Sequence, residues 1–130
     1  MSFLLAYAGA ADRWPDSHSR LDVSTTWGRT SVLAAGQADR PPVVLLHGDG
    51  ATATAWASVA AELFGRFRVL APDQPGNPGR SSSSRPFRTT SDLMSWLDEL
   101  LASVSRGPVH LAGHSSGAPP VDRSPAGWPV

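Results

Sequence analysis

The most informative stretch of this sequence is Val109-His110-Leu111-Ala112-Gly113-His114-Ser115-Ser116-Gly117. Its first four residues form a short, mainly apolar run, which is typical of a strand buried inside a parallel sheet. The next five residues match the pattern Gly-x-Ser-x-Gly. This pattern places a serine on a sharp strand-to-helix turn, where small flanking residues let the strand and the helix approach each other closely. The stretch therefore predicts an exposed, nucleophilic Ser115 at the end of a buried strand.

Two more apolar runs upstream, residues 43–47 and 67–71, have the same character. Hydrophobic residues recur at helical spacing between them, over residues 56–64, and again over residues 93–104, before the last run. The order strand, helix, strand, helix, strand predicts right-handed crossovers and a parallel sheet. We therefore expect an α/β fold.

A hairpin is expected before these strands, because two β-prone runs, residues 21–27 and 30–35, are separated by Gly28-Arg29. We divide the chain into an N-terminal segment (1–20), an α/β domain (21–117) and an irregular, proline-rich tail (118–130). The N-terminal segment has a short apolar run without a basic start. A frayed or docked helix is therefore expected there rather than a signal peptide.

The composition and charge of the chain exclude several classes of function. The chain has 130 residues, of which 41% are hydrophobic and 17% are charged, so we expect one globular domain. Because its formal net charge is zero, we expect no nucleic-acid or membrane partner. It has no cysteine, which excludes disulfides and thiol catalysis. No apolar stretch reaches the roughly 18 residues that a membrane span needs. We expect a cytoplasmic chain without a metal or an organic cofactor.

Two further motifs follow the upstream strands. His47-Gly48-Asp49-Gly50 comes after the first run, and Asp73-Gln74-Pro75-Gly76-Asn77-Pro78-Gly79-Arg80-Ser81 comes after the second. Together with the Gly-x-Ser-x-Gly stretch, they resemble the α/β-hydrolase superfamily, in its serine esterase, lipase or peroxidase-like branch. The likeness rests on a His-Gly turn with Trp56 several residues on, an Asp-x-Pro-Gly loop one residue longer than the family pattern, and the nucleophile turn. It covers residues 21–117.

The resemblance implies a role for each matching position. Ser115 would be the nucleophile that attacks a small-molecule ester or amide, and serine at this position disfavours the branches that attack through a carboxylate. The N–H of Ser116 and that of Asp49 or Gly50 would donate to the oxyanion. The remaining positions would support the site: His47 would brace its loop, His114 would shape the pocket, and the small residues at the turns are Gly48, Gly113 and Gly117.

The resemblance also implies what the chain lacks. In this family the acid and the histidine of the triad follow the nucleophile, but residues 118–130 contain Asp122 and no histidine. The upstream residues His18, His47 and His110 are poor substitutes. We therefore interpret the chain as the N-terminal portion of a hydrolase, truncated or frameshifted near residue 118, without the C-terminal strands. Our hypothesis is that this chain alone has negligible turnover, since a serine hydroxyl needs an adjacent base.

Two other interpretations stay open from the sequence. Residues 48–53 fit the pattern Gly-x-Gly-x-x-Ala after a strand. Asp73 lies near the distance of about 20 residues beyond this motif at which a ribose-binding acid is found. The chain could therefore be a fragment of a dinucleotide-binding oxidoreductase. Alternatively, it could be a non-catalytic binding module that keeps the cleft without the chemistry.

Overall fold

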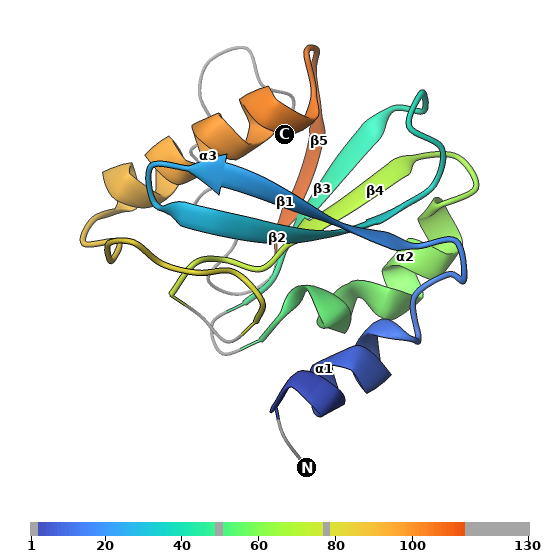
Figure 1. Cartoon of the computed structure of the whole chain (residues 1–130). Helices are drawn as coiled ribbons and strands as arrows, with labels where there is room; N and C mark the ends of the chain where they lie inside the picture. The colour runs from blue at the N-terminus through green and yellow to red at the C-terminus, as the bar shows by residue number, and fades with distance from the viewer. Residues whose placement is uncertain (1–2, 49–50, 77–78, 114–130) are drawn as a thin grey trace.

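A computed structural model of the chain describes residues 3–48, 51–76 and 79–113 (Figure 1). The elements follow the chain in this order: α1 (Phe3–Ala11), β1 (Ser19–Thr25), β2 (Gly28–Ala35), β3 (Pro42–Leu46), η1 (Ala53–Trp56), α2 (Ala57–Leu63), β4 (Arg68–Pro72), α3 (Thr90–Val104) and β5 (His110–Gly113). Among these residues no helix combines the length and the apolar character needed to cross a membrane.

The strands form one mixed sheet in the order β1-β2-β4-β3-β5. β1 pairs with β2 and β2 with β4 in antiparallel fashion, whereas β3 runs parallel to both β4 and β5. This arrangement confirms the expected α/β fold, with an N-terminal hairpin followed by three parallel strands and helical crossovers. It is the arrangement of strands that the resemblance to the α/β-hydrolase superfamily implies.

The hairpin turn lies two residues earlier than the sequence suggested. Thr25 pairs with Gly28, so the turn consists of Thr26 and Trp27 rather than of Gly28 and Arg29. Gly28 serves another purpose: its φ is +126°, and a Cβ there would stand 2.1 Å from the backbone oxygen of Ser82. The glycine therefore marks a close approach between two backbones.

The sheet separates two hydrophobic layers, because successive side chains of a strand point to opposite faces. Helix α3 covers one face, and α1 and α2 cover the other (Figure 1). On the α3 side, Trp96 and Leu97 pack against sheet residues such as Val44. On the other side, Tyr7 and Trp14 pack in a cluster with alternate sheet residues, Leu33, Val43, Leu45 and Val69 among them.

Two hydrogen bonds between side chains and the backbone stabilise the start of helix α3. The hydroxyl oxygen of Thr89 accepts a hydrogen bond from the N–H of Asp92 (3.1 Å), and the carboxylate of Asp92 accepts one from the N–H of Arg88 (2.8 Å). Both contacts satisfy backbone donors near the helix start, and the negative charge of Asp92 suits the helix dipole there.

The serine run after β4 is hydrogen-bonded to the start of β2 and to the turn before it. The N–H of Ser82 donates to the carbonyl of Arg29 and the N–H of Ser84 donates to that of Trp27. Serine hydroxyls act as acceptors in the same segment, since the N–H of Ser31 donates to Oγ of Ser81 at 2.8 Å. This part of the loop after β4 is thus tied to the start of β2 and to the hairpin turn before it.

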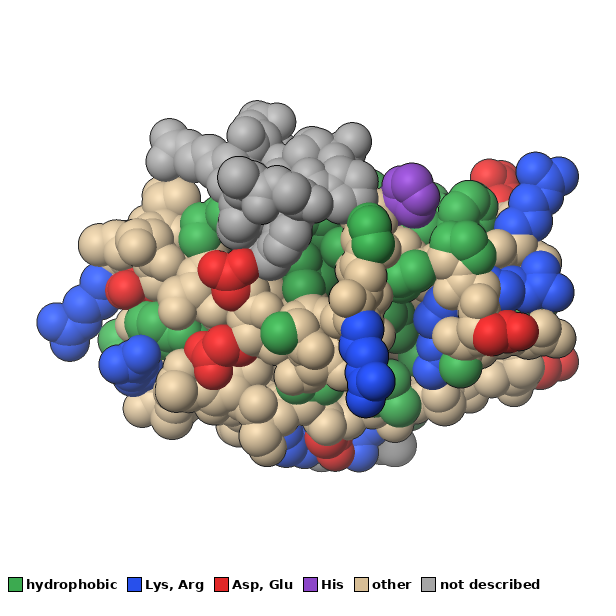
Figure 2. Space-filling model, turned by 90° about the horizontal axis from the view of Figure 1, so that it is seen from above, with side chains coloured by type: hydrophobic (Ala, Val, Ile, Leu, Met, Phe, Trp, Pro, Cys, Tyr) green, Lys and Arg blue, Asp and Glu red, His purple; other side chains and the backbone are tan. Residues whose placement is uncertain are grey.

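Figure 2 views the molecule from the end at which the parallel strands begin. Arginine side chains stand near acidic ones on this face, and hydrophobic side chains lie between them. The charge is therefore distributed over the visible face in both signs, in keeping with a net charge of zero.

Candidate active site

The candidate site lies at the edge where the parallel strands end. Leu46, the last residue of β3, pairs with Gly113, the last residue of β5. His47 follows Leu46 directly, and Asp73 follows the end of the neighbouring β4. Because the carboxyl ends of parallel strands meet at one edge, ligands of open α/β sheets bind there. The three motifs of the sequence therefore leave the sheet at the same edge.

The structure describes three of the predicted site residues, His47, Gly48 and Gly113. The proposed nucleophile and the other predicted residues lie outside the described residues; these are Asp49, Gly50, His114, Ser115, Ser116 and Gly117. The described part of the site thus consists of the strand ends and loop residues that directly precede those residues in the sequence.

His47 is buried, and both of its ring nitrogens have backbone partners. Nε2 lies 2.9 Å from the backbone nitrogen of Gln74, and Nδ1 lies 2.7 Å from the carbonyl oxygen of Gly48. A backbone N–H can only donate, so Nε2 is the acceptor and Nδ1 carries the proton that is donated to Gly48. The ring therefore connects the loop after β3 with the loop after β4.

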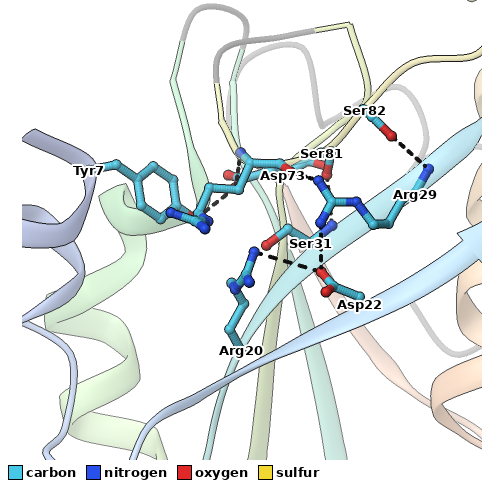
Figure 3. Close-up of polar contacts among 9 residues, drawn as sticks. Tyr7, Arg20, Asp22, Arg29, Ser31, Asp73, Ser81 and Ser82 are labelled. Atoms are coloured by element: carbon cyan, nitrogen blue, oxygen red, sulfur yellow. Dashed lines mark hydrogen bonds and ion pairs between the residues drawn. The ribbon is translucent and has the colours of Figure 1, made fainter. Parts of the chain in front are cut away.

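Asp73 is fully buried, and its carboxylate accepts three hydrogen bonds from described residues. Figure 3 shows Tyr7 and Asp73 side by side. Oδ1 accepts from the N–H of Ala53 at 2.7 Å, at the start of η1. Oδ2 accepts from the hydroxyl of Tyr7 at 2.7 Å and from the N–H of Arg80 at 2.9 Å. We call these four residues the Asp73 cluster. A buried carboxylate needs such donors, because burial without them is costly.

Tyr7 is the member of the cluster that sequence reasoning missed. It reaches Asp73 from α1, across 66 positions of the sequence. Burial raises the pKa of its phenol well above the ordinary value, and the hydrogen bond to the Asp73 carboxylate raises this pKa further. A lone tyrosine in a weakly patterned N-terminal segment offered no signal for this contact.

The cluster weakens the dinucleotide-binding interpretation. An acid that holds a ribose must present free carboxylate oxygens to the ligand, whereas Asp73 is fully buried and both of its oxygens have internal donors. The glycine turn also follows β3, after the β1–β2 hairpin, and not the first strand of the sheet. Nothing among the residues that the structure describes favours a nucleotide site here.

The other described histidines lie elsewhere. His110 is exposed at the first position of β5, at the opposite end of that strand from Gly113, and its ring packs edge-on to Phe67. Nδ1 of His18 lies 2.7 Å from the carbonyl oxygen of Pro15. Within the described ranges, no three His, Asp or Glu residues gather in a group able to hold a metal ion.

Comparison with known proteins agrees with this framework. A family model described as "Alpha/beta hydrolase family" matches residues 43–126. Carboxylesterase YbfK of Bacillus subtilis (strain 168) is 32% identical over 117 residues, which are 90% of this chain and 40% of that protein.

Solved structures show the same likeness. A naproxen esterase (carboxylesterase NP) from Bacillus subtilis superposes with a TM-score of 0.84 at 30% identity, over 88% of this chain and 40% of that one. Carboxylesterase CesB (YbfK) from the same organism gives 0.81 at 32% identity, over 85% of this chain and 39% of that one. The chain thus spans about 40% of the length of these relatives.

Proposed function

This chain belongs to the alpha/beta hydrolase family, and from that membership we propose that the whole protein is a serine carboxylesterase. The observation that supports this most directly is the sequence after β5: Gly113 ends the strand beside Leu46, and Ser115 follows two residues later in a Gly-x-Ser-x-Gly pattern. The similarity to two Bacillus carboxylesterases points to small carboxylic esters as the substrate class.

The proposed reaction is acyl transfer through Ser115. Its hydroxyl oxygen attacks the ester carbonyl carbon while a histidine takes the proton, and the alcohol leaves as that histidine returns the proton. Water then hydrolyses the acyl-enzyme. The acid and the histidine follow the nucleophile in this family's chain order. We place them in the part of the relatives' length that this chain does not span.

The oxyanion would be held by the N–H of Ser116 and by that of Asp49 or Gly50. Such donors accelerate the reaction only when they are held in place before the charge develops. His47 suits a bracing role, since its Nε2 accepts from Gln74 and its Nδ1 donates to Gly48. With both nitrogens engaged, we assign His47 to positioning rather than to proton transfer.

Labelling with a fluorophosphonate tests the nucleophile. The whole protein should form one adduct, located on Ser115 by peptide mass spectrometry, and should hydrolyse p-nitrophenyl acetate. Ser115→Ala should abolish both. Ser116→Ala is the matched control, because it keeps the backbone N–H and should retain the adduct.

The same experiment separates the alternatives. A folded whole protein that is neither labelled nor active would support a non-catalytic binding module. Turnover that survives in Ser115→Ala would refute the assigned nucleophile.

A further inference from the structure

Two consecutive residues of the loop after β4 hold both ends of the segment between His47 and Ala53. The N–H of Gln74 donates to Nε2 of His47 at one end, and Oδ1 of Asp73 accepts from the N–H of Ala53 at the other. In the sequence, Asp49 and Gly50, one of which is predicted to supply the second oxyanion donor beside Ser116, lie between these two contacts. The position of Asp73 therefore bears on where Ala53 lies relative to the loop after β4.

Tyr7 fixes this carboxylate from a separate helix. Its hydroxyl donates to Oδ2 of Asp73 at 2.7 Å, and its ring is buried against the face of the sheet that α1 covers. Figure 3 shows the ring of Tyr7 extending from α1 toward Asp73. The guanidinium of Arg80 lies 5.9 Å from the ring centroid, so the ring also has a cation beside it.

From these contacts we infer that Tyr7 is a positioning residue of the candidate active site, which acts through Asp73 to hold Ala53 and the loop after β4 in place. The inference makes α1 part of the site's framework rather than a peripheral helix. Its catalytic consequence rests on the proposed esterase function. The structural consequence of the inference does not depend on that function and can be measured on this chain.

The physical basis is the cost of an under-satisfied buried charge. Asp73 has its donors in a place that water does not reach, and each donor to a buried carboxylate is worth more than one to a neutral acceptor. Removing the Tyr7 hydroxyl makes the arrangement in which the N–H groups of Ala53 and Gln74 are hydrogen-bonded less favourable. Local opening at Ala53 and Gln74 then becomes more frequent, while the strands behind them stay closed.

Amide hydrogen exchange of wild type and Tyr7→Phe tests the inference. The amides of Ala53 and Gln74 should exchange at least about tenfold faster in the variant, relative to the amides of β3 in the same sample. Thr30→Val is the matched control, since it removes a buried hydroxyl that contacts Trp96 on the opposite face of the sheet. In that control all of these amides should change together. An unchanged ratio in Tyr7→Phe would overturn the inference.

A second measurement covers the case in which Tyr7→Phe does not fold. The sequence contains one tyrosine, so tyrosinate absorbance reports on Tyr7 alone. The phenol should stay neutral beyond about pH 10, where a free tyrosine ionises, until the chain unfolds. Burial and the neighbouring Asp73 oppose ionisation of this phenol. Arg80 and Arg20 favour its ionisation, but their effect is smaller than that of burial and Asp73. Ionisation near pH 10 in the folded chain would refute the buried contact.

Activity of the whole protein tests the catalytic part. Tyr7→Phe should lower kcat for p-nitrophenyl acetate about tenfold and leave KM nearly unchanged, because the oxyanion donors act in the transition state. Thr30→Val should keep the wild-type kcat. An inactive wild type would refute the proposed function while the exchange result still decides the role of Tyr7. An active wild type with equal kcat in both variants would refute the positioning role.

Discussion

Gly79 lies directly against the carboxyl group of Asp73: a Cβ on Gly79 would stand 2.6 Å from Cγ of Asp73. Gly79 also has a φ of +142°, a conformation that residues with a side chain rarely adopt. The next residue, Arg80, donates its N–H to Oδ2 of Asp73. The glycine therefore allows the loop to fold back onto the buried carboxylate.

Gly79→Ala should destabilise the chain by about 1–3 kcal/mol, through backbone strain and the collision with Asp73. The free energy of unfolding from urea titration measures this. Gly9→Ala is the control, since Gly9 is exposed on α1 with nothing within 4 Å of an added Cβ. It should leave stability unchanged or raise it by up to about 1 kcal/mol. Equal effects of both substitutions would contradict the proposed role of Gly79.

His47→Leu should cost about 1–3 kcal/mol of stability, because the N–H of Gln74 and the carbonyl of Gly48 lose their shared partner. Thermal unfolding followed by tryptophan fluorescence gives the measurement. The exposed His110 supplies the comparison: His110→Leu should change stability by no more than about 0.5 kcal/mol. A His47→Leu variant as stable as wild type would show that the ring does not brace the loops.

Thr30→Val should also cost about 1–3 kcal/mol, for a different reason. Nε1 of Trp96 donates to Oγ1 of Thr30 at 2.9 Å, and both residues are buried. Valine keeps the volume and leaves the indole N–H without its acceptor. Thr30→Ser keeps the acceptor and should be the more stable of the two variants in chemical denaturation. The opposite order would argue that packing of the methyl group outweighs this hydrogen bond.

Glu99 should contribute a small, pH-dependent stability. Its carboxylate accepts hydrogen bonds from the hydroxyl and the N–H of Thr26, and these contacts lower its pKa in the folded chain. The contribution is therefore present at neutral pH and is lost as the pH falls below the ordinary range of a glutamate, about 4.3. It should be at most about 1 kcal/mol, since solvent screens this exposed contact.

Unfolding free energies of wild type and Glu99→Gln at pH 7 and pH 3 test this sign. Wild type should be the more stable at pH 7, and the difference should shrink at pH 3. A difference that grew on acidification would contradict the direction of the shift.

Local sequence patterns predicted the elements of the sheet well. Apolar runs located β3, β4 and β5 to within a residue or two, because strands covered on both faces need continuous apolar sequence. The turn of the hairpin was misplaced, because Gly28 was interpreted as the turn residue. Its actual constraint is the backbone of Ser82, a contact between positions far apart in the chain.

The framework of the site could be predicted only in part. The bracing role of His47 was expected from the resemblance to the hydrolase superfamily, but its partner Gln74 belongs to another loop and was not predicted. The contact between Tyr7 and Asp73 joins a helix and a loop that share no local pattern. Such contacts depend on how crossovers bring strand ends together, which hydrophobic periodicity does not encode.

The sheet that separates the two hydrophobic layers has a consequence for how this protein tolerates change. Tyr7 and Trp96 belong to different clusters on opposite faces, so Tyr7→Phe and Thr30→Val should have additive effects, within about 0.5 kcal/mol. The effect of a substitution in one layer on the free energy of unfolding should then be the same whether or not the other layer carries a substitution. Among the described residues, Tyr7 connects the layer behind α1 to the candidate site through its hydrogen bond to Asp73, so substitutions in the layer behind α3 should leave that connection intact.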